Sequence, residues 1–254
     1  DARPPASPVP PHLLAADGTR PTPGLTDSQS SAWVRDMFAR VAPRYDLLNR
    51  LLTLQIDRLW RWRTARRLAP GLSPQSRVLD LCCGTGDLLA ALEHATPARY
   101  LGADFCLPML VRTRAKSPAP LIEADGLKLP LRDASLHLIT IGFGFRNFVN
   151  YRAALTELFR VLAPGGRLAI LEFTRPPYAL VRAWMAFWNR FVLHPLGHLL
   201  SGQQDAYQYL PDSVARFPDA PSLAQLMRDS GFPHVEFSYF DLGIVALHIA
   251  TKPL

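Results

Sequence analysis

Two glycines and a following acid have the residue types and spacing to bind a nucleoside. Gly84 and Gly86 lie between the apolar run Val78–Leu81 and a segment from Asp87 that has helical potential. This order predicts a strand, a tight turn and a helix, whose first N–H groups would face a ligand held close to the backbone. Asp104 ends a second apolar run, 18 residues after Gly86. At the tip of a second strand its carboxylate could accept both ribose hydroxyls, as in doubly wound α/β folds.

The glycine loop differs from those of two other nucleotide-binding classes. A dinucleotide loop has a third glycine three residues after the second, where this chain has Leu89. A Walker loop needs Gly-Lys-Ser or Gly-Lys-Thr, and the loop does not contain it. The pattern D-L-x-x-G-T-G-D followed by G-A-D resembles that of the S-adenosylmethionine (SAM) methyltransferases. The alternative interpretation is a tight turn with an unrelated surface Asp.

The composition indicates one substantial α/β domain with additions. The chain has 254 residues, of which 48% are apolar, and a net charge of +7. This charge is typical of a protein with an anionic partner, such as nucleic acid, an acidic membrane surface or an anionic ligand. The alternative is a basic protein that has no such partner. The three cysteines lack the spacing of a zinc site, so we predict no metal and a reduced, cytoplasmic protein. No apolar run reaches the ~20 residues of a transmembrane helix, and the N-terminus lacks a secretory signal pattern.

Apolar runs and turn residues predict a Rossmann-like, seven-stranded sheet that is mostly parallel, with the last strand antiparallel. This is the fold of class I SAM-dependent methyltransferases. The predicted strands are Arg77–Leu81, Arg99–Asp104, Leu121–Ala124, Leu136–Ile141, Arg167–Phe173, Val235–Phe240 and Ile244–Ala250. The predicted helices between them are Asp87–His94, Tyr151–Leu162 and Leu223–Asp229.

These elements predict a single domain over residues 29–254, preceded by a disordered, proline-rich tail over residues 1–28. Residues 29–70 are expected to form a helical cap over the ligand edge of the sheet, and residues 176–218 an insertion after the fifth strand. Within the insertion, residues 178–193 are apolar and aromatic but too short and too charged to span a bilayer. They are typical of a lid over a hydrophobic substrate, an interfacial helix or a dimer face, with an ordinary buried helix as the alternative.

Polar residues follow the third and fourth predicted strands, whose carboxyl ends face the ligand crevice in an open α/β sheet. Asp125-Gly126 could bind an adenine amino group and leave room for the ring, or form a simple Asp-Gly turn. Arg146 and Asn147 are expected at the reacting centre. A buried arginine needs a partner or an oxyanion, so the alternative is that Arg146 pairs with a cap carboxylate such as Asp46.

Several longer stretches together resemble the menaquinone/ubiquinone biosynthesis C-methyltransferases. The resemblance covers about residues 33–252, and the segments Y-D-x-x-N and F-G-x-R-N make it specific because generic methyltransferases lack them. The matching stretches are V-A-P-R-Y-D-L-L-N-R-L-L, I-D-R-L-W-R, V-L-D-L-C-C-G-T-G-D, G-F-G-F-R-N, R-V-L-A-P-G-G-R-L-A-I-L-E-F-T-R-P, Y-Q-Y-L-P-D-S and G-I-V-A-L-H-I-A-T-K.

The resemblance implies methyl transfer from SAM to a ring carbon of a prenylated quinol, with conversion of demethylmenaquinol to menaquinol as the first expectation. The alternative acceptor is the 2-methoxy-6-polyprenyl-1,4-benzoquinol of ubiquinone biosynthesis. Family members often have Asn at the position of Asp125 and Ser or Gly at that of Gly142, so neither residue contradicts the resemblance. The residues expected to bind SAM are Gly84, Thr85, Gly86, Asp104, Asp125, Gly126 and Gly142.

We hypothesise that Arg146, Asn147 and Tyr45 are the catalytic residues. Arg146 would stabilise the phenolate that develops when the quinol hydroxyl loses its proton. Tyr45 and Asn147 would orient that hydroxyl or hold a water that removes the ring proton. The substrate would contact Tyr45, Asn49 and Arg146, although Asp46 or Asn49 could simply cap a helix. Asp46 also remains open as a general base.

The expected partners are a prenylated quinol, an anionic membrane surface at the inner face of the cell membrane and a second copy of this chain. Nucleic acid is not expected. Enzymes that methylate amino nitrogens place Asn/Asp-Pro-Pro-Tyr after the fourth strand, where this chain has Phe145-Arg146-Asn147-Phe148. The remaining alternative is a SAM-binding scaffold in a quinone-synthesis assembly, and the complete glycine loop argues against it.

Overall fold

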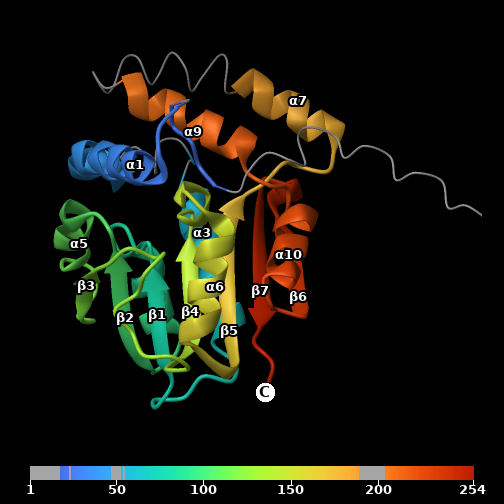
Figure 1. Cartoon of the computed structure of the whole chain (residues 1–254). Coiled ribbons are helices and arrows are strands. Elements are labelled where there is room, and N and C mark those ends of the chain that lie inside the picture. The colour runs from blue at the N-terminus through green and yellow to red at the C-terminus, as the bar shows by residue number, and fades with distance from the viewer. Residues whose placement is uncertain (1–17, 23, 47–52, 54, 189–203) are drawn as a thin grey trace, which may run out of the picture.

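A twisted sheet of seven strands forms the centre of the protein (Figure 1). The computed structural model describes residues 18–22, 24–46, 53, 55–188 and 204–254. The strand order is β3-β2-β1-β4-β5-β7-β6, and only β7 runs antiparallel to its neighbours β5 and β6, which confirms the predicted fold. The strands are β1 (Arg77–Leu81), β2 (Arg99–Asp104), β3 (Leu121–Glu123), β4 (Leu136–Gly142), β5 (Leu162–Phe173), β6 (His234–Phe240) and β7 (Val245–Thr251).

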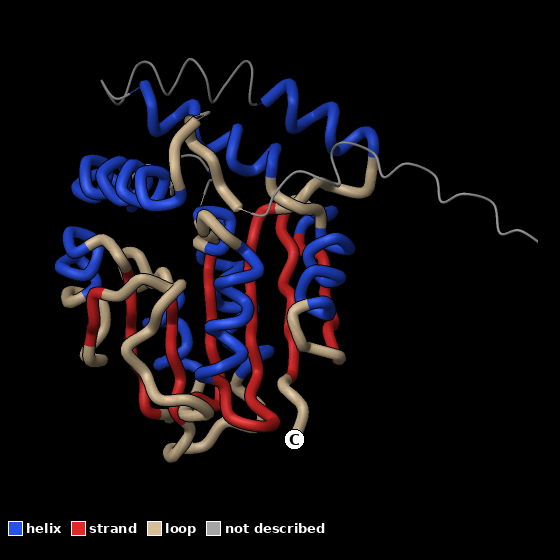
Figure 2. The backbone as a smooth tube through the Cα atoms, in the orientation of Figure 1, coloured by secondary structure: helices blue, strands red, loops and turns tan. Residues whose placement is uncertain are grey.

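Helices cover both faces of the sheet, because successive strand residues point to opposite sides (Figure 2). In β1, Leu79 and Leu81 pack with α6 (Tyr151–Val161) and α10 (Ala220–Asp229) on one face. Val78 packs on the other face with α3 (Ile56–Leu68) and α4 (Asp87–Ala95). Both faces of the sheet are therefore buried, and the ends of the strands remain to form a site.

A helical cap lies across the carboxyl ends of the strands (Figure 1). Helix α1 (Asp27–Val41) begins at a capping box in which Thr26 and Gln29 satisfy each other's backbone N–H groups. Pro43 lies in the short 3-10 helix η2 (Ala42–Arg44) that follows it. Helix α9 (Gln204–Arg216) packs on α1. Helix α7 (Ala179–Trp188) lies at the same end of the molecule as α9 (Figure 1). The cap places α1 and η2 over the ends of β1 and β2.

Most predicted boundaries agree with the structure to within one residue, and three differ by more. Strand β5 begins at Leu162 rather than Arg167, because Leu162 pairs with Leu136 across an irregularity in the register. Helix α10 begins at Ala220 rather than Leu223, because the Asp219 side chain accepts the Ser222 N–H and caps it. The predicted tail to residue 28 ends too late. The Thr19 N–H donates to the Phe148 carbonyl at 2.7 Å, and α1 has begun by Asp27.

Some predictions lie outside the described residues. Asn49, most of the tail and the 189–203 part of the insertion fall there, so their expected roles stay predictions. No helix in the described part of the chain is both long and apolar enough to cross a membrane. Among the described residues, no group of three or more His, Cys, Asp or Glu side chains is arranged to hold a metal ion.

Candidate functional site

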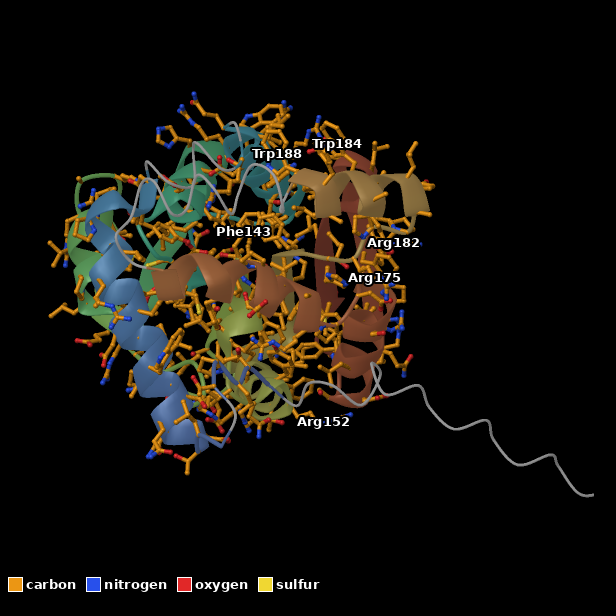
Figure 3. The ribbon with its side chains drawn as sticks, turned by 90° about the horizontal axis from the view of Figure 1, so that it is seen from above. Phe143, Arg152, Arg175, Arg182, Trp184 and Trp188 are labelled. Atoms are coloured by element: carbon orange, nitrogen blue, oxygen red, sulfur yellow. The ribbon has the colours of Figure 1, made fainter. Side chains whose placement is uncertain are left out.

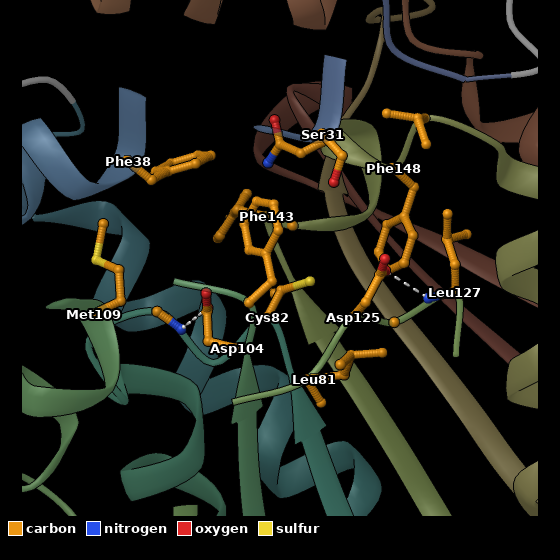
Figure 4. Close-up of a pocket in the computed structure, with 18 of the residues that line it drawn as sticks. Ser31, Phe38, Leu81, Cys82, Asp104, Met109, Asp125, Leu127, Phe143 and Phe148 are labelled. Carbon is orange, nitrogen blue, oxygen red and sulfur yellow. Dashed lines mark hydrogen bonds between the residues drawn. The ribbon is translucent and has the colours of Figure 1, made fainter. Parts of the chain in front are cut away.

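A pocket of about 700 Å³, including the space open to solvent, lies where β1, β2 and β4 end (Figure 4). Strands β2 and β3 lie on one side of β1, and β4 lies on the other side. The strand order therefore reverses beside β1, and the pocket is at this topological switch point of the sheet. Its lining combines apolar side chains with a few convergent polar groups, as in pockets for small organic ligands. The lining residues are Ser31, Phe38 and Tyr45 from the cap, Leu81, Cys82 and Gly84, Asp104, Phe105 and Met109, Ala124 to Leu127, Gly142 to Gly144, and Asn147 to Val149.

The turn after β1 has the backbone conformation that its glycines allow. Gly84 and Gly86 have φ values of 57° and 85°, and Cys82 has φ 55° without being glycine. A Cβ built on Gly84 would meet no atom closer than 4.0 Å, so the space above this glycine is open to a ligand. Cys82 and Phe143 (φ 60°) are both non-glycine residues in the left-handed region, and both line the pocket. Such strained residues cluster at ligand sites.

Asp104 is held at the pocket edge by the backbone. Its Oδ2 accepts the Gly84 N–H at 2.8 Å (Figure 4), and its Oδ1 accepts the Cys106 N–H at 2.9 Å. Each carboxylate oxygen can accept a further hydrogen bond, so two neighbouring hydroxyls fit this side chain. Burial raises the pKa of Asp104 to about 6. The prediction that Asp104 lies next to the glycine turn is confirmed.

Asp125 and Gly126 line the pocket and also form a turn. The Asp-Gly turn is therefore confirmed, while binding of an adenine amino group stays a prediction. Asp125 Oδ1 accepts the Leu127 N–H at 2.9 Å, and Figure 4 shows this bond at the pocket wall. A Cβ on Gly126 would lie 2.6 Å from the ring of Phe148. Gly126 therefore leaves the space that the Phe148 ring fills, and both residues line the pocket.

Thr85 and Gly86 do not line the pocket. The Thr85 hydroxyl donates to Asp46 Oδ1 at 2.5 Å, and Lys116 Nζ lies 2.8 Å from Asp46 Oδ2 and 2.6 Å from Asp87 Oδ1. Burial raises the pKa of Asp46, but the hydrogen bonds from Lys116 and Thr85 outweigh it and leave this pKa below its usual value. Asp46 thus anchors the cap to the glycine turn and is a poor general base.

Arg146 is buried behind the pocket and does not line it. Its Nη1 pairs with Glu172 Oε1 at 2.8 Å and donates to the Phe143 carbonyl at 2.5 Å. Its partner is therefore a carboxylate of β5, and not Asp46 of the cap. Burial lowers the pKa of Arg146, but Glu172, Tyr45 and Tyr209 together raise it more, so the guanidinium stays charged. These contacts fix the loop that carries Asn147.

Asn147 and Tyr45 both line the pocket, the first after β4 and the second from the cap. Tyr209 of α9 donates its hydroxyl to Asn147 Oδ1 at 2.9 Å. Gly142 also lines the pocket, with Leu88 3.0 Å from the position of a Cβ. The structure thus brings Tyr45, Gly84, Asp104, Asp125, Gly126, Gly142 and Asn147 together at one pocket.

Two acids that the sequence interpretation did not select lie close to this site. Asp80 on β1 accepts the Thr140 hydroxyl at 2.6 Å, and its Oδ2 has no hydrogen-bond partner in the described part of the chain. Burial raises the pKa of Asp80 to about 7. Its position as an acid inside the apolar run Val78–Leu81 is the sequence signal that could have identified Asp80. Glu172 gave a similar signal, as an acid within the apolar residues of β5.

The donor set fits SAM, whose nucleoside has two ribose hydroxyls and a flat base and whose methionine part carries an ammonium group. Asp104 has free acceptor positions at the pocket, and Gly126 and Phe148 line it, whereas the buried Asp80 comes just before the lining residue Leu81 and does not line the pocket itself. The pocket lining therefore offers groups for the ribose and the base of SAM.

Comparisons with known proteins agree with this arrangement. The model of the ubiE/COQ5 methyltransferase family matches residues 25–252. A demethylmenaquinone methyltransferase of Thermus thermophilus is 46% identical over 85% of this chain and 100% of its own length. One from Deinococcus radiodurans is 43% identical over 92% of this chain and 98% of its own length. A solved SAM-dependent methyltransferase of Thermotoga maritima, a possible histamine N-methyltransferase, shares the fold with a TM-score of 0.61, 17% identity, and coverage of 85% of this chain and 99% of that chain.

Proposed function

The chain belongs to the ubiE/COQ5 methyltransferase family, and on this premise we propose that it transfers the methyl group of SAM to a ring carbon of demethylmenaquinol, giving menaquinol. That the protein is a SAM-dependent methyltransferase follows from the family and the fold. The observation that carries the choice of acceptor is the 46% identity to a demethylmenaquinone methyltransferase across that enzyme's whole length. The position of Tyr45 and Asn147 at one pocket supports it.

The residues at the turn would hold the donor. When bound, SAM supplies a sulfonium methyl group that passes to a carbon nucleophile, and the C–S bond breaks as the C–C bond forms. Asp104 would accept the ribose hydroxyls, Asp125-Gly126 and Phe148 would hold the base, and Asp80 would face the ammonium group. Gly84 would let the donor approach the backbone.

The residues on the other side of the pocket would prepare the acceptor. A quinol ring carbon becomes nucleophilic when the neighbouring hydroxyl loses its proton, and the ring carbon loses its own proton after methyl transfer. Tyr45 and Asn147 would hold the hydroxyl oxygen in line with the methyl group. Because the guanidinium of Arg146 is paired with Glu172 behind the wall, we assign Arg146 a positioning role on the loop that carries Asn147.

The test is methyl transfer from isotope-labelled SAM to short-chain quinols. We expect labelled menaquinol from demethylmenaquinol, and less product from a matched 2-methoxy-6-prenyl-1,4-benzoquinol. A reversed preference would instead assign the enzyme to ubiquinone biosynthesis. SAM binding without transfer to either quinol would support the scaffold alternative and contradict the proposal.

Because a prenylated quinol resides in a membrane, we propose that the protein acts at the inner face of the cell membrane. Apolar side chains with exposed fractions of 49% to 83% lie on α3, on α7 and on the 3-10 helix η5 (Asp241–Gly243). We name this set the aromatic face; its members are Trp62, Leu180, Trp184, Phe187 and Leu242. Together they offer the amphipathic aromatic groups that insert at a lipid interface.

The three elements of the aromatic face are connected through η5. Trp60 and Arg63 of α3 both contact the Asp241 carboxylate, and Pro177, just before α7, packs against Gly243. Figure 3 shows Trp184 and Trp188 on one side of α7 and Arg182 on the other, near Arg175. The exposed Arg175 at this end of the molecule would favour an anionic leaflet.

A further inference from the structure

Tyr209 of α9 reaches the pocket wall through Asn147. Its hydroxyl donates to Asn147 Oδ1 at 2.9 Å and lies 3.2 Å from the Thr19 hydroxyl. The tyrosine side chain is 5% exposed and its ring packs on Trp33 at 5.4 Å between ring centroids. Thr19 and Trp33 of α1, both far from Tyr209 in the sequence, therefore hold the Tyr209 side chain in place.

The direction of the Tyr209 hydrogen bond decides which end of the Asn147 amide faces the pocket. An Asn side chain has one oxygen acceptor and one NH₂ donor group, and a tyrosine hydroxyl has a single proton to give. Burial raises the pKa of Tyr209, so its hydroxyl keeps this proton. With Asn147 Oδ1 occupied, Nδ2 is the end left for a ligand, and it has no hydrogen bond to any described residue.

The neighbouring residue on the same loop is held by the same helix face. Tyr209 and Ser213 are four residues apart on α9 and so lie on one side of it. Arg146 Nε donates to Ser213 Oγ at 3.4 Å, while Tyr209 contacts Asn147. Helix α9 thus fixes the backbone of the loop through Arg146 and the amide of the next residue through Tyr209.

We propose that Tyr209 is a positioning residue for methyl transfer, which turns the Asn147 NH₂ group toward the pocket to donate to the oxygen of a phenolic acceptor. The assignment rests on the proposed function, because the role given to this donor requires an acceptor with a hydroxyl or phenolate oxygen. A donor at this point favours the phenolate that makes the ring carbon nucleophilic. In this assignment the Asn147 NH₂ group binds no part of SAM.

The test is a double-mutant cycle in single-turnover methyl transfer. Tyr209→Phe keeps the ring on Trp33 and removes the hydroxyl, so we expect a roughly three- to tenfold lower rate with an unchanged Kd for SAM. In the Asn147→Ala background, the same change should lower the rate by less than about twofold. A merely structural role of Tyr209 would lower the rate by the same factor in both backgrounds.

Tyr100→Phe is the matched control, because the Tyr100 hydroxyl donates to the Leu92 and Thr96 carbonyls away from the pocket. It should retain the wild-type rate. A wild-type rate in Tyr209→Phe, or an equal loss in both backgrounds, would overturn the assignment while leaving the proposed function in place. Absence of transfer by the wild-type enzyme to any quinol would contradict the proposed function itself, and the assignment with it.

Discussion

Asp104 lies beside the glycine turn at the end of β2, and this position was predictable from its spacing. Its two oxygens accept one backbone N–H each and keep the capacity to accept ribose hydroxyls. The partner of Arg146 was not predictable, because Glu172 is 26 residues further along the chain and meets Arg146 only when β5 lies beside β4. Sequence spacing indicates local geometry, whereas pairing between neighbouring strands depends on the fold.

Asp104→Asn should weaken SAM binding by roughly tenfold or more, because the amide replaces a charge-assisted acceptor and cannot accept at both positions. In the wild type, affinity should fall below about pH 6, where Asp104 takes up a proton. Folding raises the pKa of Asp104, so the folded state binds this proton more tightly than the unfolded state does. The contribution of Asp104 to the free energy of unfolding is therefore largest below about pH 4 and is lost as the pH rises to about 6, whereas SAM affinity rises over the same range. Calorimetric titrations between pH 5 and 8 measure the binding. Glu236→Gln changes an exposed acid on β6 and is the control, which should bind SAM as the wild type does. A wild-type pH profile of SAM affinity in Asp104→Asn would refute a role of Asp104 in donor binding.

Arg146→Ala should reduce methyl transfer by about a hundredfold or more through misplacement of the Asn147 loop, while SAM still binds. Glu172→Gln should lower the free energy of unfolding by about 3–5 kcal/mol, because it leaves the buried guanidinium without its counter-charge. Urea unfolding at pH 7.5 and the labelled-SAM assay measure the two effects. Retained turnover in Arg146→Ala would defeat the positioning role.

At the scale of elements, the helical cap is attached to the glycine turn by one cluster of charges. Lys116 follows α5 (Leu107–Thr113), while its partner Asp46 follows η2, and the two side chains are only 23% and 17% exposed. The sequence predicted a cap over the ligand edge, but not this connection. The strands of the sheet were predicted because each is an apolar run with turn residues at its ends. The early start of β5 was missed because Pro164-Gly165-Gly166 is typical of a loop, yet Gly165 and Gly166 exchange backbone hydrogen bonds with Lys252 just after β7.

Lys116→Met should raise the KM for SAM by roughly three- to tenfold, because the cap is then no longer tied to the turn that holds the donor. The kcat should change less, since no group that contacts the acceptor is altered. Steady-state kinetics measure both values. Arg152→Met removes an exposed positive charge on α6 and should leave both unchanged. A KM for SAM in Lys116→Met equal to that of the wild type would show that the cap is held in place without this ion pair.

At the scale of the whole molecule, the cap helices α1 and α9 and helix α7 lie at the end of the sheet where the strands bordering the pocket end (Figure 1). This arrangement would let a membrane-bound acceptor reach the donor without leaving the lipid entirely. The sequence indicated aromatic residues over 178–193 and left a lid, an interfacial helix, a dimer face and a buried helix as alternatives. In the described residues α7 has no buried side chain, which argues against the buried helix.

Flotation with vesicles tests the aromatic face. We expect the protein to float with anionic vesicles at low salt, less so with neutral ones, and less after substitution of Trp184 and Phe187 by Ser. Val111→Ser on α5 removes an apolar side chain that is 66% exposed outside this face, and it should float as the wild type does. Equal flotation of the wild type and the Trp184/Phe187 variant would favour a dimer face or a role in folding for α7.

The most direct test of the account is a crystal structure with bound S-adenosylhomocysteine. The account predicts both ribose hydroxyls on the Asp104 carboxylate, the base beside Gly126 and Phe148, and the sulfur facing the space between Tyr45 and Asn147. A nucleoside bound elsewhere, or a sulfur directed away from Tyr45 and Asn147, would contradict it.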